Sequence, residues 1–223
     1  MGSQVFWRRA IEEPGWVAAV EPDGTAHTAG DLLARVNQLT CGLRELGLRP
    51  GNGLAILAPN GVAALEVYLT ALQSGWYLTP VNWHFTVPEI AYILRDSEAK
   101  VFFAHERFAA AGAGAADEAG IPASGRISYG TVPGFIPVER VRDGQPPGVP
   151  DGRVAGTTMH YTSGTTGRPK GVRRQLSGLD PTRPGNSRRC CRSSSASHRA
   201  RRTCIWSPRR TITRRSLYSA ARA

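Results

Sequence analysis

Residues 53–81 read GLAILAPNGVAALEVYLTALQSGWYLTPV and hold two short apolar runs with a helical pattern between them. The run Leu54–Leu57 lies between a glycine and a proline, which is typical of a short buried strand. Apolar residues then recur at helical spacing over Val62–Leu72, and Gly75 predicts the end of that helix. Trp76–Val81 predicts a second strand. Strand, helix and strand joined by short connections indicate parallel pairing, because the crossover returns the chain to the same edge.

The flanking sequence extends this pattern in both directions. Gly30–Gly47 carries apolar residues at helical spacing, and Thr28 with Asp31 resembles a capping pair at its start. Downstream, Thr86, Pro88 and Glu89 predict the start of a helix that runs to Arg95, and residues 100–104 (KVFFA) predict a further strand. A weak helix is expected between residues 109 and 120. We therefore predict an α/β fold, doubly wound, with a parallel sheet flanked by helices.

The net charge of +11 is confined to one part of the chain. Residues 1–180 contain 16 Lys or Arg and 17 Asp or Glu, whereas residues 181–223 contain 12 Arg and no acid. The second part is rich in Arg and Ser and shows no lasting helical or strand period, so it cannot bury enough apolar surface to offset the entropy of ordering. We predict a folded unit over 1–180 and a disordered tail over 181–223.

Cysteine use and hydropathy predict a cytoplasmic protein. Cys41 is the single cysteine of residues 1–180 and lies in a helical pattern, which is typical of a buried thiol in a reducing compartment. The first residues lack the apolar segment of a signal peptide, because Glu12 and Glu13 interrupt it. No window approaches the roughly 18 apolar residues of a membrane-spanning helix.

The stretch His160–Val172 reads HYTSGTTGRPKGV and follows a predicted strand over Val154–Tyr161. Glycines expose backbone N–H groups and hydroxyl side chains add donors, so together with the Lys170 charge they suit phosphate oxygens. The spacing differs from a Walker A loop, because Gly171 follows the lysine where that loop has a hydroxyl residue. The proline at 169 makes a helix start at Lys170 unfavourable.

YTSGTTGRPKGV as a whole resembles the phosphate-binding signature of the adenylate-forming superfamily of acyl-CoA synthetases, nonribosomal adenylation domains and luciferases. Residues 71–104 are similar to the helix, glycine, strand and proline-valine-asparagine segment of these enzymes, and GVRRQLSGLD at 171–180 resembles the continuation in bacterial acyl-CoA synthetases. The resemblance covers Val5–Asp180 and implies a partial N-terminal adenylation domain.

The resemblance implies a two-step reaction that uses ATP, Mg²⁺ and coenzyme A. A carboxylate attacks the α-phosphate of ATP and pyrophosphate leaves; a thiol then displaces AMP from the acyl-adenylate. The residues that would wrap the β- and γ-phosphates are Thr162, Ser163, Gly164, Thr165, Thr166 and Gly167. Lys170 would neutralise the leaving pyrophosphate, which is electrostatic stabilisation of a developing charge.

Later motifs of the family are not found in this sequence. They are an aromatic-Gly-x-Thr-Glu motif, a Thr-Gly-Asp motif and a lysine in a small C-terminal domain. The chain has two lysines, Lys100 in a strand pattern and Lys170 in the phosphate-binding stretch. We therefore expect a truncated acid:CoA ligase that is inactive alone, with no identifiable catalytic residue or metal ligand and with an acid substrate that cannot be named.

Three hypotheses apply to residues 181–223. An Arg-rich arm could bind nucleic acid, which gives the alternative function of a non-catalytic nucleotide-binding protein with a nucleic-acid-binding tail. Zinc binding would involve Cys190, Cys191, His198 and Cys204, although their spacing matches no C-x-x-C pattern. The favoured hypothesis is a frameshift, because a G/C-rich gene translated out of register yields Arg, Ser, Pro and Ala with almost no Lys or acid.

Several other side chains are expected to have structural rather than functional roles. Four aromatic residues near strand ends are expected in the core: Trp76, Tyr77, Trp83 and Phe85. Lone histidines without a partner, His84 and His160, are expected to be structural or exposed. Glu66 and Tyr68 on the predicted helix carry no functional assignment.

The frameshift hypothesis is tested by the gene sequence. We expect that a one-base shift of frame just past the codon for Asp180 encodes the aromatic-Gly-x-Thr-Glu motif downstream. DNA sequencing of this region is the measurement. If neither alternative frame encodes the motif, the hypothesis is wrong.

Overall fold

The computed structural model describes residues 3–162 and 169–182. Helices are α1 (Ser3–Glu12), α2 (Ala29–Glu45), α3 (Val62–Ser74), α4 (Val87–Asp96), α5 (Ala109–Ala119) and α6 (Val138–Arg142), with 3₁₀ turns at Glu106–Phe108 and Ala123–Gly125. A six-stranded sheet contains β3 (Gly53–Leu57), β4 (Tyr77–Pro80), β5 (Ala99–His105), β6 (Arg126–Tyr129), β7 (Ile136–Pro137) and β8 (Thr157–Thr158). Two ribbons pair β1 (Val17–Val20) with β2 (Ala26–Thr28) and β9 (His160–Thr162) with β10 (Lys170–Val172).

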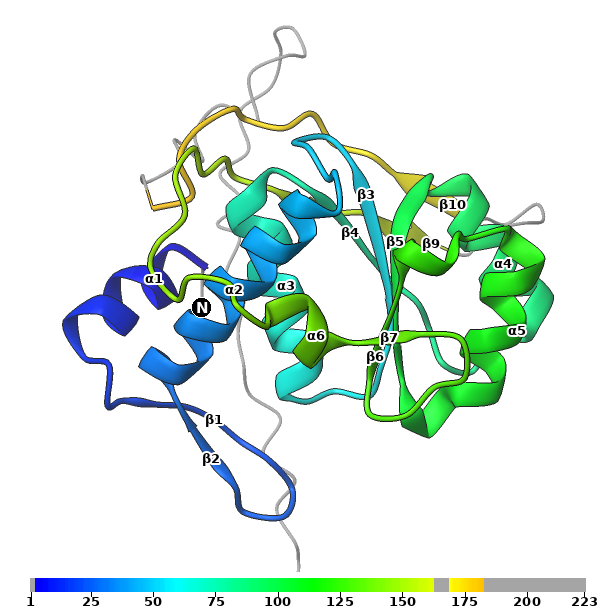
Figure 1. Ribbon diagram of the computed structural model, residues 1–223. Helices are drawn as coiled ribbons and strands as arrows, with labels where there is room; N and C mark the ends of the chain where they lie inside the picture. Colours follow the sequence, from blue (N-terminus) through cyan, green and yellow to red (C-terminus); the bar gives the residue numbers. More distant parts are fainter. Residues whose placement is uncertain (1–2, 163–168, 183–223) are drawn as a thin grey trace, which may run out of the picture. The chain divides into compact units, whose positions relative to one another are not determined.

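The large sheet is parallel throughout and doubly wound. Its strand order is β7-β6-β5-β3-β4-β8, so the chain steps from β3 to β4 on one side and then crosses β3 to reach β5 on the other. Figure 1 shows α2, α3 and α6 on one face of the sheet and α4 and α5 on the opposite face. This arrangement confirms the predicted α/β class with a helix-flanked parallel sheet.

Side-chain alternation along the central strands builds a separate core on each face. Leu54 and Ile56 pack with α2, α3 and α6, whereas Ala55 and Leu57 pack with α4 and α5. In β5, Phe103 belongs to the first core and Phe102 to the second. Strands buried on both faces read as continuous apolar runs, which explains the composition of 54–57 and 101–104.

The helix starts follow the predicted capping residues. The Thr28 side chain accepts a hydrogen bond from the Asp31 backbone N–H at the start of α2. At α4, the Thr86 backbone N–H donates to the Glu89 carboxylate in a capping box, with a proline in the first turn. Gly75 ends α3 in the left-handed conformation at φ 71°. Local sequence therefore determines where α2 and α4 begin and where α3 ends.

Two predictions about individual segments were wrong. The strand expected over 154–161 is divided into β8 and β9, because the chain changes its pairing partner from β4 to β10 after Met159. Trp83 is 47% exposed rather than in the core, whereas Trp76 is fully buried and Tyr77 is 8% exposed as expected. Trp83 lies in the loop between β4 and α4. The predicted tail from residue 183 onward lies outside the described residues.

Close packing of α2 against α6 depends on a glycine. A Cβ added at Gly42 would overlap the carbonyl oxygen of Val141 and lie 2.9 Å from its Cγ1 atom. Gly42→Ala is therefore expected to lower the free energy of unfolding by about 1–3 kcal/mol, despite the helix propensity of alanine, which favours it by roughly 1 kcal/mol. Urea unfolding followed by circular dichroism measures the difference.

The matched control is Gly15→Ala, because a Cβ at Gly15 meets no atom within 4 Å. Its free energy of unfolding should stay within about 0.5 kcal/mol of the wild type. Equal stability of the Gly42→Ala variant would contradict the close approach of the two helices.

Candidate functional site

The phosphate-binding stretch begins and ends in the ribbon of β9 and β10. The two strands pair antiparallel, with Lys170 opposite Thr162. The preceding residue of the chain, Met159, is still tied to the large sheet, because its backbone N–H donates to the Leu78 carbonyl oxygen at 2.8 Å. The ribbon thus follows directly from β8, which pairs with the first two residues of β4.

The structure describes two of the seven predicted phosphate-binding residues. Thr162 is the last residue of β9, and Lys170 is the exposed first residue of β10, so the two lie in one strand pair. The expectation that no helix begins at Lys170 is confirmed, because a strand begins there. The remaining predicted residues, Ser163, Gly164, Thr165, Thr166 and Gly167, lie outside the described residues.

The chain that follows β10 is fixed to the large sheet through Arg173. The Arg173 guanidinium carbon lies 4.5 Å from the centre of the Tyr77 ring. The same side chain donates to the Glu98 carboxylate at 2.9 Å and to the Gly51 carbonyl oxygen at 3.0 Å. Sequence analysis gave Arg173 no role, since its partners lie 75 and 122 residues earlier in the chain.

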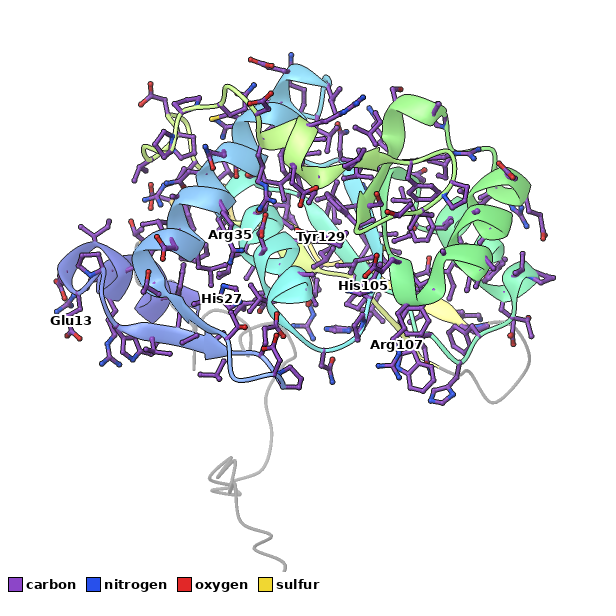
Figure 2. The ribbon with its side chains drawn as sticks, turned by 60° about the horizontal axis from the view of Figure 1, so that its bottom comes forward. Glu13, His27, Arg35, His105, Arg107 and Tyr129 are labelled. Carbon is purple, nitrogen blue, oxygen red and sulfur yellow. The ribbon has the colours of Figure 1, made fainter. Side chains whose placement is uncertain are left out.

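A second polar cluster surrounds the first turn of α3, at the carboxyl ends of β5 and β6. Figure 2 shows His27 and Arg35 on one side of this turn and His105 and Tyr129 on the other. Together with Glu66 they border a cavity of about 280 Å³. His105 accepts a hydrogen bond from the Arg107 N–H through Nδ1 at 3.1 Å. The cluster therefore brings side chains from β2, α2, α3, β5 and β6 to one place.

Glu66 is the buried charge at the centre of this cluster. Its side chain is 1% exposed, and its carboxylate accepts a hydrogen bond from Arg142 Nη1 at 2.9 Å. Arg35 Nε lies 3.7 Å from the other carboxylate oxygen. Burial raises the pKa of Glu66, and attraction to Arg142 and Arg35 opposes this in part. The ion pairs join α3 to α2 and α6 across the first core.

The sequence interpretation missed Glu66. The only signal was one carboxylate in the apolar helical pattern of residues 62–72. Its strongest partner, Arg142, lies 76 residues later, so sequence spacing alone gave no reason to connect them. The expectation that lone histidines are structural or exposed is confirmed for His84 and His160, which are both exposed.

Aromatic rings lie in the segments that follow β4 and β5, with Trp83 exposed and Phe108 half-buried. The Trp83 and Phe108 rings stack with centroids 5.7 Å apart and an interplanar angle of 12°. The His84 ring lies 3.5 Å from that of Trp83, and the Arg107 guanidinium carbon lies 5.8 Å from the Phe108 centroid. The loops at the carboxyl ends of β4 and β5 thus meet through a pair of stacked aromatic rings.

The described residues offer neither a cluster of metal ligands nor a membrane-spanning helix. Within residues 3–162 and 169–182, no group of three or more His, Cys, Asp and Glu side chains could hold a metal ion. In the same part of the chain, every helix is too short or too polar to cross a bilayer.

The fold defines an α/β domain with a parallel, helix-flanked sheet, and sequence comparison identifies the family. The AMP-binding enzyme family matches residues 6–179. The chain is 37% identical over 167 residues to feruloyl-CoA synthase from an Amycolatopsis species, covering 74% of this chain and 31% of the relative. It is 33% identical over 172 residues to a long-chain-fatty-acid–CoA ligase of Mycobacterium tuberculosis, covering 74% and 33%. The chain belongs to the AMP-binding enzyme family.

Solved structures agree with this assignment. A putative long-chain-fatty-acid CoA ligase from Rhodopseudomonas palustris superposes with a TM-score of 0.64 at 28% identity, covering 76% of this chain and 42% of that one. An anthranilate CoA ligase in complex with anthranoyl-AMP, at 22% identity, shares the fold with a TM-score of 0.64 over 77% of this chain and 33% of its own. The chain spans about a third of the length of the curated relatives it matches.

The raised pKa of Glu66 gives a pH-dependent prediction. Below the unfolded-state pKa of about 4.3, the Glu66 carboxyl is protonated in both the folded and the unfolded protein. As the pH rises from there to the folded-state pKa of Glu66, the unfolded protein loses this proton first. Wild-type stability should therefore fall over this range relative to Glu66→Gln, which carries no titrating group. Urea unfolding at a series of pH values from 4 to 8 measures the difference.

Glu12→Gln serves as the control, because the Glu12 side chain is 57% exposed on α1. Its stability should run parallel to that of the wild type over the same pH range. A difference between wild type and Glu66→Gln that grows in favour of the wild type with rising pH would mean that Arg142 and Arg35 outweigh the cost of burial.

Proposed function

We propose that this chain is the amino-terminal part of an ATP-dependent acid:CoA ligase and that its 162–170 stretch binds the polyphosphate of ATP. The observation that carries the proposal is the β9–β10 ribbon, which follows the carboxyl end of β8 and presents Lys170 to solvent opposite Thr162. Similarity to feruloyl-CoA synthase and to a long-chain-fatty-acid–CoA ligase supports an organic acid as the substrate.

In the proposed reaction, an oxygen of the carboxylate substrate bonds to the α-phosphorus of ATP while the bond to the β-phosphate oxygen breaks. The Lys170 ammonium group would lie beside the charge that develops on the departing pyrophosphate. The hydroxyl and backbone N–H groups of residues 162–167 would supply hydrogen-bond donors to the same oxygens. A thiol, that of coenzyme A in the family, then attacks the acyl carbon and AMP leaves.

We further propose that the chain does not complete this reaction by itself. An essential lysine is expected near the carboxylate and α-phosphate in the family, and the two lysines present, Lys100 and Lys170, are placed elsewhere. Lys100 is exposed in β5, whose neighbours are β3 and β6 in the middle of the sheet. Mg²⁺ and coenzyme A would be bound mainly by parts of the family's enzymes that lie outside the region matched by residues 6–179.

We also propose that the protein is cytoplasmic.

The two lysines provide a matched pair for testing the proposal. Calorimetric titration with MgATP should show binding to the wild type and to Lys100→Ala, and at least about tenfold weaker binding to Lys170→Ala, because hydrogen bonds to charged groups contribute roughly 1.5–3 kcal/mol. Acid-dependent ATP–pyrophosphate exchange should be undetectable in all three. Equal affinity of the two variants would contradict the role of Lys170, and robust exchange would contradict the proposed inactivity.

A further inference from the structure

The β9–β10 ribbon cannot hold its own orientation. It pairs only three residues of each strand and forms a two-stranded sheet separate from the large one. Isolated two-stranded ribbons are marginally stable in water. Contacts with the rest of the domain must therefore decide where the two flanks of residues 163–168 lie.

One face of α4 contacts both flanks of this segment. On the entry side, the Tyr161 hydroxyl donates to the Asp96 carboxylate at 2.6 Å. On the exit side, the Tyr92 hydroxyl donates to the Pro169 carbonyl oxygen at 3.2 Å. Tyr92 and Asp96 are four residues apart, so they are neighbours on the helix surface. Figure 1 shows the ribbon beside α4.

The helix that makes these contacts is itself firmly placed. Four residues of α4, Ile90, Ala91, Ile93 and Leu94, are at most 1% exposed in the second core. Its start is fixed by the capping box at Thr86 and Glu89. Groups on the opposite, outward side of such a helix form a rigid support, which is what positioning a ligand-binding stretch requires.

Gly171 in β10 leaves room for the side chains of Met159 and Tyr161. A Cβ at Gly171 would overlap the Met159 methyl carbon and lie 2.9 Å from the Tyr161 ring carbon Cζ. Because Gly171 has no side chain, the Tyr161 ring can lie across the ribbon with its hydroxyl group at Asp96. The Tyr161 ring also packs against the second core.

We propose that Tyr92, Asp96 and Tyr161 are positioning residues for ATP binding, which hold both flanks of the phosphate-binding stretch against α4. The inference rests on the proposed function, because it assigns these residues a purpose in that same site. None of the three needs to touch ATP. They act by restricting the positions open to Thr162 and Lys170 before the nucleotide arrives, so that less ordering accompanies binding.

The test removes hydroxyl groups and leaves the rings in place. The variants are Tyr161→Phe, Tyr92→Phe and the double variant, with Tyr68→Phe on α3 as the matched control because Tyr68 is 37% exposed on the other face of the sheet. In the full-length chain without nucleotide, amide hydrogen exchange over residues 160–172 should be about 5- to 10-fold faster in the single variants, as expected for loss of one hydrogen bond. Peptides from β3 and β5 should be unchanged.

Titration with MgATP should show a Kd about 5- to 10-fold higher in each single variant than in the wild type, at an unchanged urea midpoint. Asp96→Ala should behave like Tyr161→Phe, whereas Asp96→Asn, which keeps an acceptor oxygen, should stay close to the wild type. A merely structural role would lower the urea midpoint without a selective change in exchange over 160–172.

The outcomes separate the two proposals. Binding that is lost in Lys170→Ala but unchanged in Tyr161→Phe and Tyr92→Phe would overturn the positioning role alone. Exchange over 160–172 that matches the wild type in the double variant would overturn it too. A wild-type chain that does not bind MgATP would overturn the proposed function and, with it, the assignment of positioning residues.

Discussion

Parallel pairing of β3 between β4 and β5 is the interaction on which the rest of this domain depends. Every residue of β3 is buried, and both neighbours bond to it along its length. A strand enclosed in this way must offer apolar side chains to both faces, and each face then needs a helical cover. The covers follow from connectivity, since α3 joins β3 to β4 on one face and α4 joins β4 to β5 on the other.

This double winding also gathers the polar residues. Because all six strands point the same way, their carboxyl ends meet at one edge of the sheet, where the stacked Trp83 and Phe108 rings and the cavity beside α3 are found. The β9–β10 ribbon is instead held beside α4 through Tyr92 and Asp96. Glu66 lies one helical turn inside the start of α3 and is neutralised in part by Arg35 and Arg142. A buried ion pair of this kind is weak support for stability. Its clearer consequence is that α2, α3 and α6 each contribute one charged side chain to a single cluster.

Much of the fold was predictable because its signals are local. Capping at Thr28 and Thr86, the glycine stop at Gly75 and the apolar run of β3 each lie within a few residues of the element they define. The exposure of Trp83 and the division of the 154–161 segment were not predictable in the same way. Both depend on where the large sheet ends, and that limit is set by strands brought together from distant parts of the chain.

The α/β class, the order of helices and strands around β3 and the family of the phosphate-binding stretch all follow from the amino-acid sequence. These properties are carried by periodicity, by capping residues and by one contiguous motif. Three further features depend on the folded arrangement: Glu66 meets Arg142, Arg173 lies over Tyr77, and α4 bonds to both flanks of residues 163–168. Those contacts join residues 65 to 96 positions apart, and their pairing depends on how the crossovers stack rather than on any local pattern.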